Sequence, residues 1–502
     1  MKSRQDRRGL GAWLNDVIAP LAPSLALGRE KAMAQRSALR AAASTYNAAG
    51  KSARSKDFHV NGSDAVEAMR AARYRLSWIS RDMLRNNPRA VKIRRQLRNL
   101  IVGAGIRPSV SWVGDEITHE GVTDKQRVER LIKLHLMTTD FDADGRVNLL
   151  GMQGVVADAI VGDGEVLLRR RFRRSADGYS LPFQVQVLEA DFLNEQIDGK
   201  LANGNTAIQG IEFDQRGRRV AYHLFKSHPG GRQGAMPATT RVDARNIIHA
   251  FDVNRPGQQR GVSWFAPVIT LLHELQKYQD GQVKRQEIAA MFAAVFRSSE
   301  AAKELEGDIG QLAPGAMLTI GNEEEIDFTD PPSVDGYEAF MRVTDRAIAA
   351  GVGLTYEGYT GDYTGVNYSS ARMGRMDTDP NVRDLQQNMM IAQVCAGIAR
   401  WTQEAIQDVS DISEANYDLD WTPPVRPVVD PTKDYKANEI AMRSGQKSRR
   451  QTIREGGGDP NATEAEIVDE RDWENEKDLV LTSNAGATAP ASESEGAKNE
   501  NR

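Results

Sequence analysis

The most restrictive feature of this sequence is a change of hydrophobic periodicity part-way along the chain. Residues 63–161 carry apolar positions at helical spacing, but residues 165–251 break into short runs rich in β-branched and aromatic residues. Helical spacing returns over residues 263–296. Strands that are grouped between helical regions, rather than alternating with helices, predict an α+β fold. The expected strands are 165–172, 183–189, 208–213, 219–225 and 246–251, with a hairpin turn at 215–217.

Turn and cap residues divide the helical regions further. Ser63 is a suitable N-cap, Pro88 after two asparagines splits residues 63–102 into two helices, and Gly103 ends the second. Ser263 is the expected cap of the long helix 263–296. A break is expected at Pro380 inside an otherwise helical stretch. Further helices are expected over 123–137, 149–161, 333–350, 368–409, 434–445 and 461–474, and residues 351–367 form a loop rich in glycine and tyrosine.

Composition excludes several classes of protein. The chain has 502 residues, of which 40% are hydrophobic and 27% charged, so it forms a globular protein of about two to four domains. Its one cysteine, Cys395, excludes an intrachain disulfide and a cysteine-based zinc site, and its apolar surroundings predict a core residue. The longest apolar run, 288–296, is too short to cross a membrane. Polar and proline residues interrupt residues 1–27, which argues against a signal peptide.

Charge is distributed unevenly along the chain. Residues 1–110 hold 22 Lys and Arg against 7 Asp and Glu, whereas the remainder holds 43 against 62. Residues 455–502 alone hold 13 acidic and 4 basic residues. A basic head and an acidic body suggest pairing between the head of one subunit and the body of the next, or contact of the head with a polyanion. A merely solvated basic face is an equally plausible interpretation.

The sequence motifs of common enzymes are incomplete here. Residues 47–52 resemble the end of a phosphate-binding loop but lack its first glycine, and His273-Glu274 lacks the second histidine of a zinc protease. Residues 261–263 lack the last glycine of a nucleophile elbow, and residues 142–145 lack the spacing of a calcium loop and are expected to form a turn. His223 and His249 are expected to be structural. We therefore expect no catalytic activity, no metal and no cofactor.

Several segments, taken in order, resemble the lambda-type portal proteins of tailed phages. They are distributed over residues 25–410, and no single one is decisive. The segments are RLSWISRDMLRNNPRA at 75–90, NLIVGAGI at 99–106, GDGE at 162–165, LEAD at 188–191, IIHAF at 247–251, RPGQ at 255–258, RGVSW at 260–264 and NYSSAR at 367–372.

The resemblance implies an α+β portal-type subunit with long stem helices, a β-rich wing, a small clip and a helical crown. Such subunits form a ring, typically of twelve copies, at one capsid vertex. On this sequence the implied order is a basic helical arm 1–62, a wing 63–262, a first stem helix 263–296, a clip 297–332, a second stem helix 333–350, a tunnel loop 351–367, a long helix with a connector 368–429, a crown 430–480 and a disordered acidic tail 481–502.

The resemblance also implies a DNA channel. An acidic wall with sparse basic rings would keep DNA mobile, because a strongly basic wall would bind its phosphates tightly. Basic rings are expected from Lys277, Lys284 and Arg285, although these three could equally form a solvated face or subunit salt bridges. Contacts from the tunnel loop are expected from Tyr356, Tyr359, Asp362 and Tyr363, with ordinary loop packing as the alternative.

The partners implied by the resemblance are other copies of the chain, the terminase large subunit, the major capsid and scaffold proteins, head-completion proteins and double-stranded DNA, with no membrane. The implied location is the virion, after assembly in the host cytoplasm. Two other hypotheses remain open. The Arg-rich helices between Arg70 and Arg98 could serve a monomeric or dimeric nucleic-acid-binding protein, or the chain could be a hydrolase with an unrecognised site.

Overall fold

The structure is a computed structural model that describes residues 62–114, 116–231, 236–291, 295–297, 325–327, 336–424, 430–458 and 460–479, together with Lys31, Ala32 and Gln35. The chain divides into two compact units, Met1–Asp64 and Ala65–Arg502. The predicted basic arm, clip and acidic tail lie almost entirely outside the described residues, as do residues 47–52. Everything below therefore concerns the second unit.

Three helices open this unit: α3 (Ala65–Arg70), α4 (Arg73–Asn86) and α5 (Pro88–Ile101). The predicted division at Pro88 is confirmed. Asn87 caps α5 by accepting hydrogen bonds from the backbone N–H groups of Arg89 and Ala90, while Pro88 occupies the first turn, where no N–H is needed. Gly103, with φ of +51°, follows the end of α5 as expected.

Two helices follow before the sheets. A capping box between Thr123 and Gln126 starts α6 (Asp124–His135), and Asn148 caps α7 (Leu149–Asp163). Asp142 accepts backbone hydrogen bonds from Asp144, Arg146 and Val147, so residues 142–145 form the expected turn.

Two antiparallel sheets form the β-rich region, and four of the five predicted strands are present. The fifth, predicted over 208–213, is interrupted by a turn at Gln209 and Gly210 that separates β7 from β8. A three-stranded sheet has the order β11-β4-β5, and a five-stranded sheet has the order β10-β9-β8-β7-β6. The hairpin between β8 and β9 turns at Asp214, whose carboxylate accepts from the N–H groups of Arg216 and Arg218. The bounds are β4 Glu165–Phe172, β5 Phe183–Leu188, β6 Gly199–Lys200, β7 Thr206–Ile208, β8 Ile211–Phe213, β9 Arg219–Phe225, β10 Thr239–Asp243 and β11 Ile247–Phe251.

One pairing joins distant parts of the sequence. Strand β1 (Arg107–Trp112) pairs antiparallel with β14 (Tyr417–Thr422), and neither strand was predicted. The other short pairs are β2 (Thr118–His119) with β3 (Val122–Thr123), and β12 (Val295–Arg297) with β13 (Glu325–Asp327).

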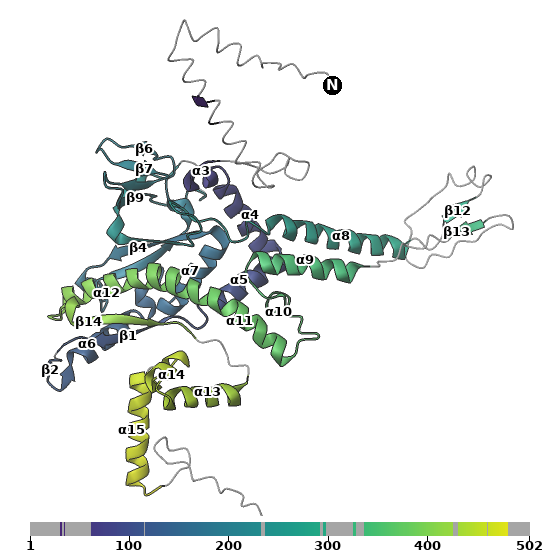
Figure 1. Cartoon of the computed structure of the whole chain (residues 1–502). Helices are drawn as coiled ribbons and strands as arrows, with labels where there is room; N and C mark the ends of the chain where they lie inside the picture. Colours follow the sequence, from purple (N-terminus) through teal and green to yellow (C-terminus); the bar gives the residue numbers. More distant parts are fainter. Residues whose placement is uncertain are drawn as a thin grey trace, which may run out of the picture. The chain divides into compact units, whose positions relative to one another are not determined.

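Helices dominate the rest of the chain (Figure 1). The first predicted stem helix is shorter than expected: α8 covers Ile269–Met291, and Ser263 lies in a turn before it, where its hydroxyl accepts from the N–H of Phe265. The other helices are α9 (Tyr337–Gly351), α10 (Tyr356–Thr360), α11 (Tyr368–Asp384), a π-helix (Leu385–Cys395), α12 (Ala396–Val409), α13 (Pro431–Arg443), α14 (Arg449–Glu455) and α15 (Pro460–Glu476). No helix among the described residues is long and apolar enough to span a bilayer.

The predicted break at Pro380 is wrong. Pro380 lies inside α11 with its ring exposed to solvent, where water can satisfy the carbonyl that loses its hydrogen-bond partner. Helix continues through the π-helix and α12. A wider π turn at Leu385–Cys395 is the irregularity that the sequence did not predict.

The largest core cluster lies between the three-stranded sheet and the helices that cover it. It includes Val156 and Ile160 from α7, Val166 from β4, and Trp401 from α12, all buried. Trp401 donates its indole N–H to the carbonyl of Arg245 at 2.7 Å. Cys395 is buried in this cluster, as predicted, and burial raises the pKa of its thiol.

Two glycines allow the chain to cross itself at the start of α8. A Cβ on Gly164, whose φ is +93°, would lie 2.2 Å from the carbonyl carbon of Val262, and a Cβ on Gly261 would lie 2.1 Å from the carbonyl oxygen of Gly164. Only glycine permits this close approach between the end of α7 and the segment that leads into α8.

We expect Gly164→Ala to lower the free energy of unfolding by roughly 3 kcal/mol or more, since it combines an unfavourable φ with a backbone clash. Gly257 has a φ of +81° but no atom near the position of a Cβ. Gly257→Ala should therefore lose only about 1 kcal/mol, from the backbone conformation alone. Thermal denaturation of both variants tests this, and equal losses would contradict the importance of the crossing.

Candidate channel surface

A buried carboxylate, that of Glu165 at the start of β4, connects the elements that support the predicted channel. It accepts hydrogen bonds from Arg260 Nε at 2.9 Å, Arg73 Nη1 at 3.1 Å, His249 Nε2 at 2.9 Å and the backbone N–H of Gly261 at 2.8 Å. The side chains of Glu165, Arg73, Arg260 and His249 are all at least 98% buried. Four segments distant in sequence therefore meet at one anion.

The charge state of this network follows from its geometry. Burial pushes the pKa of Glu165 upward, but the nearby Arg260 and Arg73 outweigh it and hold that pKa well below its usual range. Burial also lowers the pKa of His249, so its imidazole is neutral and donates from Nε2. Glu195 pairs with both arginines. Two carboxylates thus balance two guanidinium groups away from water.

The network fixes the base of α8. Gly261 is one of its members, and two further contacts hold the residues that follow: the hydroxyls of Ser263 and Ser80 lie 2.7 Å apart, and the N–H of Trp264 donates to the carbonyl of Val161 at 3.2 Å. The helix that the sequence assigns to the channel therefore starts from a rigid base.

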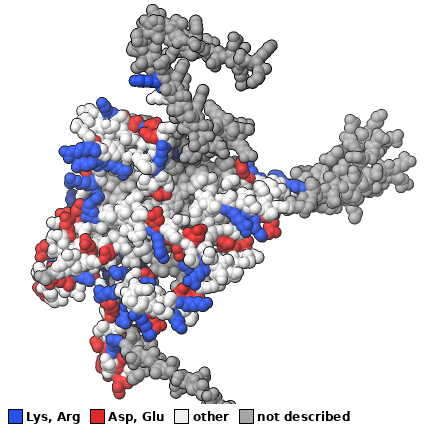
Figure 2. All heavy atoms as spheres, viewed as in Figure 1, with Lys and Arg blue, Asp and Glu red and all other residues white. Residues whose placement is uncertain are grey.

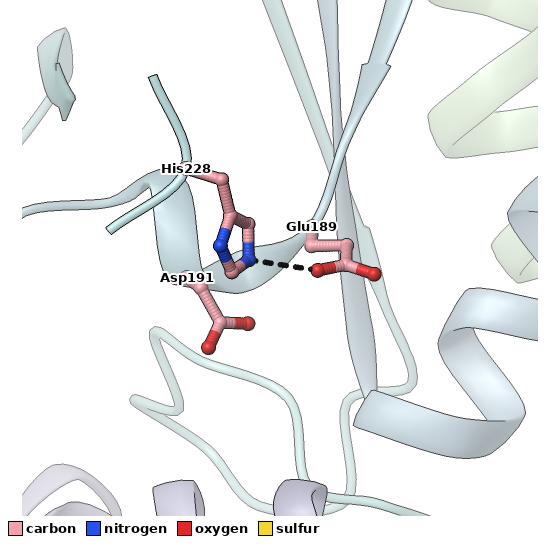
Figure 3. Close-up of side chains that lie close together, drawn as sticks. All are labelled: Glu189, Asp191 and His228. Carbon is pink, nitrogen blue, oxygen red and sulfur yellow. Dashed lines mark hydrogen bonds and ion pairs between the residues drawn. The ribbon is translucent and has the colours of Figure 1, made fainter. Parts of the chain in front are cut away.

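A second ion-pair cluster includes Asp163, two residues before Glu165, and Figure 3 shows three of its members, Glu189, Asp191 and His228. The guanidinium of Arg81 donates to Asp163 at 2.7 Å and to Asp191 at 2.5 Å, and lies 3.6 Å from Glu189. Glu189 in turn accepts from Nε2 of His228 at 2.9 Å. This cluster ties α4 to the end of α7 and to the segment after β5.

Glu189, Asp191 and His228 are close enough together to be considered as metal ligands. The backbone N–H of Gly230 donates to Nδ1 of His228, however, so the ring proton sits on Nε2, the atom that faces Glu189. A metal ion would need the lone pair of Nε2. Asp191 is also already engaged by Arg81. The arrangement is therefore that of an ion-pair cluster.

Most arginines of the basic N-terminal helices pair with acidic residues of the same chain. For residues 65–101 this favours pairing within the subunit over the pairing between subunits that the sequence suggested. The acids come from elements scattered along the acidic part of the sequence, so folding balances part of the positive charge of α3, α4 and α5 within the subunit. The pairs are Arg70–Asp198, Arg73–Glu165, Arg81–Asp163, Arg89–Asp345 and Arg98–Asp158. On the face shown in Figure 2, Lys and Arg lie intermingled with Asp and Glu.

Helices α8 and α9 form an antiparallel pair (Figure 1). Gly351 at the end of α9 lies against Val268, just before α8, and Tyr278 stacks on Tyr337 with ring centroids 5.8 Å apart. Leu272 and Leu275 are buried in the cluster that joins the pair to α5. One side of α8 is thus fixed, and its other side is left at the surface.

The surface side of α8 carries alternating charges. Lys277 and Lys284 are exposed, and Arg285 is half-buried. Three exposed carboxylates alternate with the two lysines along one side of the helix. We call this row the α8 stripe; it consists of Glu274, Lys277, Asp280, Lys284 and Glu287.

The predicted tunnel loop contains a short helix. Thr355 caps α10 by accepting from the N–H of Gly358, and Gly361, with φ of +77°, ends it. The hydroxyl of Tyr356 donates to Asp362 at 3.3 Å, and hydrogen bonds from Thr364 lower the pKa of Asp362. The glycine content predicted a loop. In the structure Gly358 donates its N–H to the cap residue Thr355, and Gly361 ends the helix.

Two of the three tyrosines assigned to the tunnel loop differ sharply in exposure. Tyr363 is 65% exposed, whereas Tyr359 is 2% exposed. The hydroxyl of Tyr359 donates to Asp345 at 2.9 Å, and Asp345 also accepts from Arg89 at 2.9 Å. The expectation that Tyr359 contacts DNA is therefore wrong, because its side chain joins α10 to α9 and α5 in the core.

Sequence reasoning missed the Glu165 network altogether. Glu165, Arg260 and Gly261 were noticed only as parts of the segments GDGE and RGVSW. Nothing in the sequence shows that these two segments meet, because their contact depends on the crossing of the chain at Gly164 and Gly261.

Comparison with known proteins identifies the family. The family model described as phage portal protein, lambda family, matches residues 51–386. The chain belongs to the lambda family of phage portal proteins. It therefore has a portal role at a capsid vertex, as part of a portal ring in a phage particle, and its α+β fold is a portal fold. This family is structural rather than enzymatic.

Individual relatives are distant. The chain is 24% identical to the probable portal protein of Halomonas phage phiHAP-1 over 425 residues, which cover 80% of each chain. It is 23% identical to portal protein B of Escherichia phage lambda over 239 residues, or 39% of this chain and 43% of that protein. A solved chain from the neck of a native gene transfer agent particle, computed with C12 symmetry, is 14% identical, with a TM-score of 0.43 over 74% of this chain and 89% of that one.

Removing the charge of Glu165 should be strongly destabilising. We expect Glu165→Gln to lower the free energy of unfolding by about 3–5 kcal/mol at neutral pH, because Arg73 and Arg260 lose the charge that compensates them. A carboxylate whose pKa is lowered by folding stabilises the fold at pH values above its pKa in the unfolded chain, which is about 4. This stabilisation is lost as the pH falls through the pKa that the carboxylate has in the folded protein. The variant should therefore lose less stability than the parent protein on acidification.

Denaturant unfolding at pH 7 and below pH 4 measures both effects. Glu189→Gln, at a half-exposed carboxylate, is the matched control and should change stability by less than about 1 kcal/mol. Similar losses in the two variants would show that the buried network has no special importance.

Tyr359→Phe should lower the free energy of unfolding by about 1 kcal/mol, since it removes the hydrogen bond to the buried Asp345. Tyr363→Phe, at an exposed ring, should change stability by less than about 0.5 kcal/mol. Thermal unfolding of the two variants distinguishes a core tyrosine from a surface tyrosine. A larger effect at Tyr363 would contradict this assignment.

Proposed function

We propose that twelve copies of this chain form a ring whose central channel carries double-stranded DNA into and out of the capsid. The family supports a portal ring, and the observation that carries the channel proposal is the α8 stripe. In this proposal the α8 stripe faces the DNA. The Glu165 network holds the segment from which α8 starts.

Alternating charges suit a wall that DNA slides past. A duplex carries about one phosphate charge per 1.7 Å of axis, and a row of lysines alone would displace counterions and hold it. In the α8 stripe each lysine lies within one turn of a carboxylate, so the local field largely cancels. Lys277, Lys284 and Arg285 then guide the phosphates without retaining them.

The exposed part of the tunnel segment supplies a second set of contacts. Tyr356, Asp362 and Tyr363 lie on the short segment around α10, next to α9, and Tyr363 has the exposure needed to touch DNA. Tyr359 has no part in this proposal because it is buried.

The remaining assignments follow the family order. Residues 63–262 form the wing, α8 and α9 the stem, 297–332 the clip and α13–α15 the crown. The proposed partners are the terminase large subunit, the major capsid and scaffold proteins and the head-completion proteins, with assembly in the host cytoplasm before packaging. We propose no enzymatic activity; the partner motor supplies the energy.

The competing nucleic-acid-binding function is disfavoured by one observation. Its proposed contacts were the arginines between Arg70 and Arg98, and most of these already pair with carboxylates of their own chain. Paired guanidinium groups attract phosphate less strongly than free ones.

A fully basic stripe should make the channel adhesive. We expect rings of the variant Asp280→Lys with Glu287→Lys to bind duplex DNA at least about tenfold more tightly than the parent ring at low salt, and to lose this gain as salt is raised. Binding is measured by fluorescence anisotropy with a short duplex, and ring formation by negative-stain electron microscopy.

The matched control is Glu116→Lys with Glu120→Lys, which makes the same charge change at exposed positions far from α8 in the sequence. Equal gains in the two variants would mean that α8 does not face DNA. A parent particle without a central opening would overturn the channel itself.

A further inference from the structure

Helix α11 leaves an unusual face at the surface of the subunit. Met373 is 66% exposed and Met376 is 63% exposed, and Pro380 one turn further on is exposed as well. These three residues fall on one side of the helix, since positions three, four and seven apart share a face. The opposite side, with Thr378 and Val382, is buried.

Charged residues border this apolar row, with opposite signs on its two sides. At about 100° per residue, Arg372 and Arg383 lie beside Met376, with the half-buried Asp379 just beyond them, whereas Asp377 and Asp384 lie beside Met373. Arg372, Arg383, Asp377 and Asp384 are all exposed. We call Met376 with Arg372 and Arg383 the basic edge, and Met373 with Asp377 and Asp384 the acidic edge.

These four charges make no ion pair with their own chain in the part that the structure describes. Ion pairs one turn apart do form on two other helices: Arg342 pairs with Glu338 in α9, and Arg443 pairs with Glu439 in α13. Asp384 accepts only a neutral hydrogen bond, from the side chain of Asn388 at 2.5 Å. The two edges thus carry opposite charges but lie on different sides of one helix. They cannot form ion pairs with each other within a subunit.

A ring resolves this mismatch. Successive copies in a closed ring meet through two different surfaces, one on each side of the subunit. We propose that the basic edge of α11 in one copy contacts the acidic edge of α11 in the next, and that this contact helps to close the ring. The proposal rests on the ring arrangement of the proposed function and names the surface that builds it.

The spacing along the helix predicts the principal pair. Arg383 and Asp384 differ by one residue, or about 1.5 Å of rise, so in parallel helices at equal height they lie opposite each other. Arg372 and Asp377 are about 7.5 Å apart along the axis, a distance that a long arginine side chain partly spans. Met373 and Met376 then cover each other across the same boundary.

Charge reversal tests the contact between copies. Arg383→Glu alone would place a second carboxylate opposite Asp384 of the next copy, and Asp384→Lys alone would place a lysine opposite Arg383. We expect each variant alone to lower the fraction of assembled rings by at least about tenfold, because like charges then meet at every interface. A 1:1 mixture of the two should assemble again, since in an alternating ring every interface joins opposite charges.

Mass photometry measures the ring fraction, and circular dichroism confirms that each variant is folded. Lys133→Glu, an exposed charge reversal on α6, is the control and should assemble like the parent protein. Single variants that assemble normally, or folded variants that fail to assemble when mixed, would overturn the proposal. A parent protein that forms no open ring would instead contradict the proposed function.

Cross-linking gives a second, independent measurement. A 1:1 mixture of Met373→Cys and Met376→Cys should form covalent dimers under mild oxidation, whereas each variant alone should form few. The natural Cys395 is buried and does not interfere. Equal cross-linking in the mixture and in the separate variants would show that the two edges do not meet.

Discussion

The fold depends on one buried carboxylate. Glu165 sits at the start of the central strand of the three-stranded sheet and receives hydrogen bonds from α4, from β11 and from the segment that leads into α8. A buried carboxylate is tolerated only when opposite charges and donors surround it, so these elements must be in place together. The close approach of Gly164 to Val262 makes this arrangement possible.

The same principle explains where the basic residues go. Most arginines of α3, α4 and α5 pair with carboxylates, several of them far away in the sequence, so part of the charge asymmetry is balanced inside the subunit. Two patterns of exposed charge stand out on the described helices, namely short-range alternation on α8 and two opposite edges on α11. Local cancellation of charge suits a wall that DNA slides past. Separated complementary charges suit a contact between copies.

The family resemblance and the helical assignments could be obtained from the sequence because both depend on local patterns. The β-rich runs predicted four of the five expected strands, and Asn87 with Pro88 predicted the boundary between α4 and α5. Local patterns also misled. Pro380 predicted a break that solvent exposure makes unnecessary, and the glycines around α10 suggested an unstructured loop. Tyr359 was assigned to DNA because it lies in the segment that the resemblance implies is the tunnel loop, although its hydroxyl donates to a buried aspartate on α9.

The sequence by itself determined the α+β class, the structural role of Cys395 and the membership of the portal family, since composition, periodicity and ordered motifs are properties of the chain alone. Only the tertiary structure decided which charges are already paired. It buried Glu165 among two arginines and left the edges of α11 unpaired, and it moved Tyr359 into the core. The reason is that electrostatic partners are set by distance in space and by exclusion of water, and neither quantity is encoded in the spacing of residues along a chain.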